Sequence, residues 1–251
     1  MSSAEAFDTD RKVFARLDST NAEGLRLGAE LTAPTWLLAL EQTAARGRRG
    51  RAWVNPAGNF AASLVMRPPE PVARWALRSF AAALALDEAL QSLGVPAPAL
   101  SLKWPNDVLL NGGKLAGILL ETAGPVLVIG IGVNLAAAPV PDELEPGAVP
   151  PVALGPETGV TVTPAALLDA LAPAYAGWAG RLRRYGFAPL RPATGVHDSV
   201  EVRAVVIAHD GDASLVATHG VTVVTPPVAR IVAASTADVG ESVRHGGLLK
   251  V

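Results

Sequence analysis

LKWPNDVLLNGGKLAGILLE (residues 102–121), continued by PVLVIGIGVNL (residues 125–135), is the stretch that decides the fold. It consists of short apolar runs separated by turn residues, and Asn111–Gly112–Gly113 lies between two of them. Asn and Gly between apolar runs are typical of a tight hairpin. Strands that follow one another this closely, without a helix between them, indicate an antiparallel meander.

Helical patterns flank this meander on both sides. Residues 19–31 carry the spacing of a capping box, which predicts a helix capped by Thr20. Residues 71–94 place large apolar side chains largely on one helical face. Residues 163–182 repeat apolar side chains at helical spacing, and Pro173 is expected to kink this helix.

The remaining segments complete the expected fold class. Residues 35–44 and 59–67 read as strands on either side of a loop, whereas the proline-rich residues 136–158 read as a surface connection. From about residue 198 onward, short β-like runs with turns between them predict a small C-terminal barrel. We therefore expect an α+β protein with a mixed, mostly antiparallel sheet and flanking helices. Its domains would be 1–195 and 196–251.

Composition narrows the class of protein. Of 251 residues, half are hydrophobic and 18% are charged, with a formal net charge of −2, so no global positive field attracts nucleic acid or an anionic membrane. The absence of cysteine excludes disulfides and thiolate chemistry, and the histidines show no metal-ligand spacing. No apolar run could span a bilayer and no signal peptide is apparent, so we expect a cytoplasmic protein without a membrane partner.

The most charged segment is RGRRGR, residues 46–51. Glycines let the backbone approach a ligand closely, and guanidinium groups bind phosphate or carboxylate oxygens through paired hydrogen bonds. The same residues also fit a solvated basic loop or a nucleic-acid-binding loop. These residues alone leave the three interpretations open.

Two lysines stand out because only four of the 21 basic residues are lysine. Lys103 fits a strand edge with an aliphatic stem lying over apolar surface. Lys114 begins an otherwise apolar run that contains Gly117, which indicates a bound anionic group there. The predicted hairpin also brings Asp107 near Lys114. In VIGIGVNL, Gly130 and Gly132 make room either for a ligand or for a neighbouring backbone, and the sequence does not decide between them.

Five motifs together resemble a known family. STN, EQT followed by RGRRGRAW, KWPND, KLAGIL and IGIGVNL occur in the order and approximate spacing of the catalytic domain of biotin protein ligases. The resemblance covers residues 17–135. It implies the class II synthetase-like fold of biotin and lipoate ligases, with an SH3-like barrel at the C-terminal end.

The resemblance also implies roles for individual residues. The catalytic residues would be Lys114, Arg46 and Arg48. The biotin site would be formed by Ser19, Thr20, Asn21, Gln42, Thr43, Gly47, Arg48, Arg49, Lys114 and Gly117. The nucleotide site would be formed by Arg48, Arg49, Arg51, Trp53, Lys103, Asn106, Asp107, Leu115 and Asn134. Asn106 and Asp107 would lie on the metal side, with Mg²⁺ held mainly by the phosphates of ATP and not as a tightly bound metal.

The chemistry implied by this family has two steps. Biotin and MgATP form biotinoyl-AMP, and a lysine of a biotin carboxyl carrier domain then attacks the acyl carbon. Because a carboxylate meets a triphosphate, positive groups must be supplied at that point. The arginine loop would close over the adenylate and exclude water. A sheet edge would serve for carrier docking or for a homodimer.

Three departures from the family pattern are visible. Ala45 stands where the family usually has glycine, which predicts a stiffer entrance to the loop. Only sixteen residues precede the LDSTN segment, so we expect no DNA-binding helix-turn-helix domain and no DNA partner. The segment HDGDASLVATHG replaces the glycine-rich pattern expected in the C-terminal barrel.

Three other functions were weighed against this one. A lipoate or other acyl ligase would use the same adenylate chemistry on the same fold. A nucleic-acid-binding module would use the arginines and Trp53 as a basic, stacking surface, which the near-neutral overall charge argues against. A sensor that binds biotin without transferring it is opposed by Lys114 and the complete set of arginines.

Overall fold

The computed structural model describes residues 8–103, 106–139, 149–186, 199–209, 214–224 and 231–232. Its main sheet has the order β1 (Asp10–Phe14), β2 (Thr35–Ala39), β3 (Phe60–Met66), β7 (Val126–Val133), β6 (Gly113–Ala123), β5 (Asp107–Leu110), β4 (Leu100–Lys103) and β10 (Ile231–Val232). β1 runs parallel to β2 and β10 runs parallel to β4, while the other neighbours are antiparallel. The mixed, mostly antiparallel sheet and its meander are confirmed.

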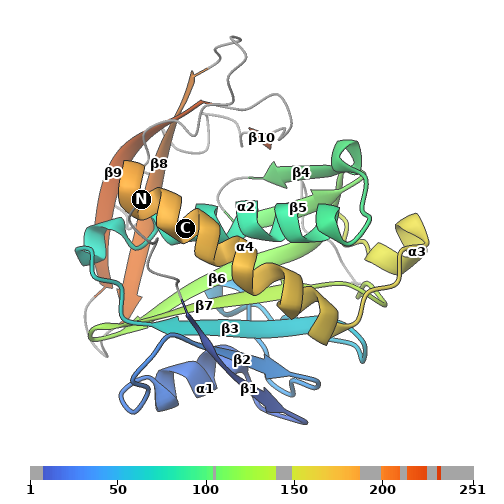
Figure 1. The fold of residues 1–251 in the computed structure, drawn as a ribbon, viewed down its shortest axis with the longest axis horizontal. Helices are drawn as coiled ribbons and strands as arrows, with labels where there is room; N and C mark the ends of the chain where they lie inside the picture. The colour runs from blue at the N-terminus through green and yellow to red at the C-terminus, as the bar shows by residue number, and fades with distance from the viewer. Residues whose placement is uncertain are drawn as a thin grey trace, which may run out of the picture.

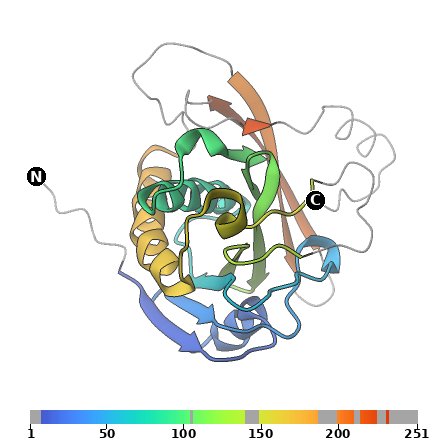
Figure 2. The ribbon, with the colours of Figure 1, turned by 90° about the vertical axis from the view of Figure 1, so that its right-hand side faces the viewer.

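Helices cover both faces of this sheet (Figures 1 and 2). α2 (Leu77–Ser92) and α4 (Pro164–Tyr185) pack together over one face and bury the larger hydrophobic core. α1 (Thr20–Leu27) lies on the opposite face, over β3 and β7, above a smaller apolar cluster centred on Val65 and Val128. The alternation of side chains along each strand supplies one apolar set to each face.

Two glycines let α1 approach the sheet closely. A Cβ atom added to Gly24 would lie 2.9 Å from a methyl carbon of Val65, and one on Gly28 would lie 2.6 Å from a methyl carbon of Val126. Real Cβ atoms essentially never approach other atoms this closely. Arg67 fixes the other end of the helix by donating to the backbone oxygens of Gly28 and Ala29 at 2.8 and 3.0 Å. The middle and the C-terminal end of α1 are thereby held close to the sheet.

The cap of α1 differs from the sequence prediction. Ser19, not Thr20, is the N-cap: it has extended backbone angles, and its hydroxyl accepts a hydrogen bond from the backbone N–H of Ala22. Glu23 does not complete a capping box, because its carboxylate accepts from Arg26. The side chain of Thr20 is consequently left for other contacts.

The other helical predictions are partly confirmed. Residues 71–94 divide into the 3-10 turn η2 (Val72–Arg74) and α2, and α4 continues as one element through Pro173. The segment 136–158 is not only a surface connection, because it contains α3 (Leu154–Thr158) with Leu154 fully buried. None of the helices in the described ranges has the combination of length and apolar character needed to cross a bilayer.

The C-terminal region is described only in its strands. β8 (Ser199–His209) and β9 (Ser214–Val224) form an antiparallel hairpin, while β10 joins the main sheet beside β4. The rest of 196–251 lies outside the described residues, as does the boundary expected at 195/196. The barrel and the division into two domains therefore stay predictions.

Candidate functional site

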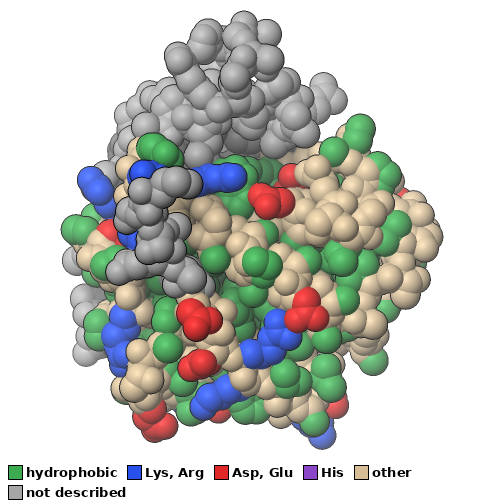
Figure 3. All heavy atoms as spheres, viewed as in Figure 1, with side chains coloured by type: hydrophobic (Ala, Val, Ile, Leu, Met, Phe, Trp, Pro, Cys, Tyr) green, Lys and Arg blue, Asp and Glu red, His purple; other side chains and the backbone are tan. Residues whose placement is uncertain are grey.

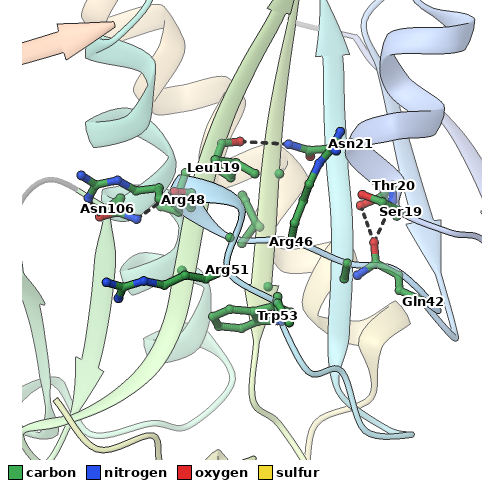
Figure 4. Close-up of a pocket in the computed structure, with 18 of the residues that line it drawn as sticks. Ser19, Thr20, Asn21, Gln42, Arg46, Arg48, Arg51, Trp53, Asn106 and Leu119 are labelled. Carbon is green, nitrogen blue, oxygen red and sulfur yellow. Dashed lines mark hydrogen bonds between the residues drawn. The ribbon is translucent and has the colours of Figure 1, made fainter. Parts of the chain in front are cut away.

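A cavity of about 380 Å³ opens on the face of the sheet that carries α1. It lies between the N-terminal end of α1, the loop 45–53, and strands β6 and β7 (Figure 4). Its lining residues are Ser19, Thr20, Asn21, Gln42, Ala45, Arg46, Gly47, Arg48, Arg51, Ala52, Trp53, Asn106, Asp107, Lys114, Gly117, Ile118, Leu119, Gly130, Ile131 and Gly132. The cavity thus collects most of the residues that the sequence predicted for the site.

Glycines form the floor of this cavity. Gly117 on β6 lies directly opposite Gly132 on β7, and the indole of Trp53 lies over both. A Cβ atom added to Gly132 would lie 2.6 Å from the indole, and one on Gly130 would lie 2.1 Å from the side-chain oxygen of Asn21. Side chains at these positions would collide with Asn21 and Trp53. The sequence left open what Gly130 and Gly132 make room for, and in the structure they make room for the side chains of Asn21 and Trp53, which line the cavity.

The arginine loop forms a small hairpin. Trp53 N–H donates to the carbonyl of Ala45 at 2.9 Å, and Gly47 N–H donates to the carbonyl of Arg51 at 2.7 Å. The 3-10 turn η1 (Arg48–Gly50), which includes Arg49, closes it, and Gly50 takes a positive φ of 72°. Ala45 has no positive φ, so this closed geometry does not require a glycine there.

One end of the cavity is lined mainly by uncharged polar side chains. Gln42 accepts from Thr20 N–H at 2.7 Å, and the hydroxyl of Ser63 on β3 lies 2.7 Å from Thr20 Oγ1 and 2.6 Å from Asn21 Oδ1. Ser63 is fully buried and was missed from the sequence. A small polar residue at the centre of the apolar strand 59–67 is the signal that could have found it.

An ion pair holds the end of α1 that supplies these groups. Arg26 donates two hydrogen bonds to Asp18, at 2.9 and 2.7 Å, and Asp18 also accepts from Ser19 N–H. The Arg26 guanidinium and the Ser19 backbone N–H lower the pKa of Asp18 to about 2. Asp18 is consequently an anion throughout the neutral range, and it anchors the chain immediately before the polar end of the cavity.

The opposite end of the cavity is cationic because of an irregularity in β6. The register against β5 shifts, so that Asp107 faces Gly117, Val108 faces Ala116 and Leu109 faces Lys114. Leu115 and Ala116 both point into the core, which turns Lys114 back onto the face of Gly117. A regular strand would put Lys114 on the opposite face.

Lys114 and Asp107 meet at this end. Lys114 Nζ lies 2.9 Å from Asp107 Oδ1 and 5.9 Å from the ring centroid of Trp53. Asp107 Oδ1 is buried and accepts no hydrogen bond of good geometry within the described residues, so this contact is an ion pair of poor alignment. The proximity predicted from the hairpin is confirmed.

The arginines of the loop reach both ends of the cavity. Arg48 donates to Asn106 Oδ1 at 2.7 Å, and the Asn106 amide donates to the carbonyl of Ile118 at 3.0 Å. Arg46 lies 3.6 Å from Glu121 of β6. Figure 4 shows the Arg46 side chain extending toward α1 while Arg48 and Arg51 extend to the other side.

Other residues predicted for the site lie outside the cavity lining. Thr43 is exposed, and its hydroxyl contacts the carbonyl of Leu17. Lys103 of β4 lies opposite Asp107 of β5 in the strand register, and Asp107 lines the cavity. Leu115 is buried in the core, and Asn134 is buried with its amide donating to the carbonyl of Val152 at 3.1 Å.

The residues expected on the metal side do not form a metal centre by themselves. Within the described ranges, no three acidic or histidine side chains gather as ligands. Asn106 Oδ1 is occupied by Arg48, whereas Asp107 Oδ1 is a buried carboxylate oxygen without an aligned donor. Asp107 fits a divalent cation that is held mainly by other groups.

The fold and the cavity together define an α+β protein with a polar, arginine- and lysine-lined cavity against one face of a mixed sheet. A sequence profile of the biotin/lipoate A/B protein ligase family matches residues 13–135. Over 186 residues the chain is 56% identical to a biotin–[acetyl-CoA-carboxylase] ligase of Paracoccus denitrificans, covering 72% of this chain and 78% of that protein. The chain therefore belongs to the biotin/lipoate A/B protein ligase family.

Two further comparisons agree with this assignment. A biotin–[acetyl-CoA-carboxylase] ligase of Mycobacterium tuberculosis is 44% identical over 149 residues, which span 57% of this chain and 55% of that relative. The biotin protein ligase of Aquifex aeolicus in complex with biotin and ATP superposes with a TM-score of 0.61 at 24% identity, covering 82% of this chain and 85% of the other. At this identity the structural match shows the fold, and it confirms the expected catalytic fold of these ligases.

Proposed function

We propose that the chain activates biotin with ATP to biotinoyl-5'-AMP and pyrophosphate, and then transfers biotin to a lysine of a biotin carboxyl carrier domain. The observation that carries the proposal is one cavity that combines the hydroxyl and amide groups beside α1 with three arginines and a lysine. The 56% identity to a biotin–[acetyl-CoA-carboxylase] ligase supports the same reaction.

The polar end suits the head group of biotin better than that of lipoate. A ureido ring carries two N–H donors and one carbonyl acceptor, and the hydroxyls and amides of Ser19, Thr20, Asn21 and Gln42 can match both kinds of group. A dithiolane ring offers no donor, so buried groups at this end would lose their partners. This favours biotin as the acid.

The cationic end suits a carboxylate and a triphosphate brought together. Arg46, Arg48, Arg51 and Lys114 line the cavity, where Asp107 is the one acidic lining residue. Lys114 supplies a compact charge that can bridge the biotin carboxylate and the α-phosphate, whereas the arginines bind phosphate oxygens in pairs. Such preorganised charge stabilises the charge that develops on the phosphoryl group.

Magnesium would reach the site with ATP. Among the described residues, the Asp107 carboxylate could contact the magnesium ion. Asn106 Oδ1 could contact it only if Arg48, which donates to this oxygen, moved to the substrate. The ion supplies neutralisation of the phosphate charge when it is bound. Lys114, once separated from Asp107, is available to the biotin carboxylate.

The loop 45–53 would exclude water from the acyl phosphate. Its hairpin already covers the glycine floor through Trp53, and its arginines reach both ends of the cavity. Ordering such a loop over a reactive intermediate protects the intermediate until the carrier arrives.

A prediction about the loop follows from Ala45. Ala45→Gly should loosen the hairpin, because the extra conformational freedom of glycine costs about 0.4–1 kcal/mol when the loop is ordered. In the absence of carrier, the variant should therefore lose biotinoyl-AMP at a rate roughly two- to fivefold higher. Hydrogen exchange at 45–52 should slow when biotin and ATP bind, and should slow less in the variant. Ala57→Gly, in the exposed turn after the loop, is the matched control. Equal exchange with and without the two substrates would contradict a closing loop.

The carrier domain would dock beside an exposed strand. β1 is an edge of the sheet, its Asp10–Val13 side chains are exposed, and Val13 is among the most exposed large hydrophobic residues described. An edge strand offers unpaired backbone groups to a second copy or to a carrier strand.

We place the reaction in the cytoplasm, where carrier and ATP meet. Figure 3 shows both charge signs interspersed on the face of α2 and α4, which does not favour nucleic acid there.

The direct experiment is a transfer assay. Labelled biotin, ATP, magnesium and a biotin carboxyl carrier domain should give labelled carrier, and an excess of lipoate should not compete. A carrier whose acceptor lysine is changed to arginine is the control, and it should stay unlabelled. Label that appears only with lipoate as donor would overturn the choice of biotin, and the absence of any adenylate would overturn the ligase assignment.

A further inference from the structure

Glu121 lies on β6 at the boundary between the polar end of the cavity and the arginine loop. Its two carboxylate oxygens contact different elements: Oε2 accepts from the Asn21 amide at 2.8 Å, and Oε1 lies 3.6 Å from Arg46 Nη2. Gly117, Leu119 and Glu121 alternate along β6 on the cavity face. One side chain therefore touches both the helix that forms the polar end and the loop that closes the cavity.

The contact with Asn21 decides which way its amide points. Ser63 can donate or accept through its hydroxyl, so the contact of 2.6 Å with Asn21 does not fix the orientation by itself. The carbonyl of Leu119 is a weak partner at 3.4 Å. An ionised carboxylate only accepts, so Glu121 requires the nitrogen on its side. Asn21 Oδ1 then lies over Gly130 and accepts from the Ser63 hydroxyl, in a side chain that lines the cavity.

The contact with Arg46 places a negative charge beside a cavity for an anionic substrate. Such a carboxylate would repel that substrate unless a cation accompanied it. Arg46 is 48% exposed and Glu121 is 22% exposed, so the pair is partly screened and can be broken and formed as the loop moves. In the loop conformation of this structure, Arg46 lies beside the carboxylate that also holds the amide of Asn21.

We propose that Glu121 is a positioning residue that fixes the Asn21 amide for the ureido group of biotin and anchors the closing loop through Arg46. This inference rests on the proposed function, and it assigns one residue to two separable tasks. The amide contact should govern the affinity for biotin. The arginine contact should govern how long the adenylate is retained.

Two variants separate the tasks. Glu121→Met removes both contacts, and because it leaves a buried donor without a good acceptor, biotin should bind about tenfold more weakly. Glu121→Gln keeps an acceptor for Asn21 and removes the charge, so biotin affinity should change far less. Both variants should release biotinoyl-AMP roughly two- to fivefold faster, which is the scale of a partly exposed ion pair. The affinity for ATP alone should not change in either.

The measurements are biotin binding by calorimetry without ATP, and release of preformed labelled adenylate without carrier. Asp169→Asn is the matched control: Asp169 also pairs with an arginine, Arg11, and lies on α4, which covers the other face of the sheet.

The outcomes are distinct. Unchanged biotin binding in Glu121→Met, or equal weakening in the Met and Gln variants, would overturn the amide task. Unchanged adenylate release in both variants would overturn the loop task. Equal weakening of biotin and ATP binding with a lower melting temperature would assign Glu121 to stability alone. Failure of the unaltered protein to form adenylate would instead contradict the proposed function, while biotin binding would still test the contact with Asn21.

Discussion

Lys114→Ala should slow formation of biotinoyl-AMP about a hundredfold, which corresponds to about 3 kcal/mol of barrier. The β-bulge in β6 directs Lys114 into the cavity, and its Nζ lies 2.9 Å from Asp107, with 31% of the side chain exposed. Without the lysine, the cavity keeps the carboxylate of Asp107 where a carboxylate and a phosphate must approach each other. Pyrophosphate exchange dependent on biotin is the measurement.

Two other variants sharpen this test. Lys12→Ala removes a lysine from the exposed edge strand β1 and should leave pyrophosphate exchange unchanged. Lys114→Arg should restore only part of the rate, because a planar guanidinium does not replace a compact ammonium between two anions. A wild-type rate of pyrophosphate exchange in Lys114→Ala would show that Lys114 does not take part in adenylate formation. The loop arginines would then be the groups that stabilise the developing charge.

Gly130→Ala should weaken biotin binding by roughly five- to a hundredfold, the effect of about 1–3 kcal/mol of overpacking. The added Cβ would lie 2.1 Å from Asn21 Oδ1. Asn21 cannot easily move aside, because Ser63 and Glu121 both hold its amide. Isothermal calorimetry with biotin measures the loss directly.

A second glycine provides the control for this change. Gly177 lies within α4, and no atom stands within 4 Å of a Cβ added there. Gly177→Ala should therefore leave biotin binding unchanged and should stabilise the protein by about 0.5–1 kcal/mol through helix propensity. Undiminished biotin affinity in Gly130→Ala would show that the Asn21 amide is not part of the biotin site.

Local patterns predicted much of the fold. The four runs of 99–135 form strands because each is too short and too closely followed by a turn to form anything else. The helix after Thr163 begins where its cap and proline indicate. By contrast, the capping box predicted at Thr20 was wrong, because Ser19 is the N-cap. Residue spacing cannot choose between two neighbouring hydroxyl residues, and here the Thr20 hydroxyl contacts Ser63 on the sheet.

The cationic half of the candidate site was visible in the sequence for the same local reason. RGRRGR, Asp107 and Lys114 are chemically conspicuous, and a hairpin brings the last two together. Ser63 and Glu121 were not predicted as site residues, because a serine in a strand and a glutamate at the end of an apolar run are ordinary in isolation. Their roles arise from contacts with α1, which is distant in the chain.

The sequence by itself determined the antiparallel meander, the three longer helices and the charge available to the site, because hydrophobic period, turn chemistry and residue type act over a few positions. Only the tertiary structure decided which face of the sheet became the cavity. That choice depends on the bulge that redirects Lys114, on the pairing of Gly117 with Gly132, and on the close approach of α1. The bulge and the glycine pair depend on the register between neighbouring strands, which residue type alone does not set, and the approach of α1 joins segments 100 residues apart.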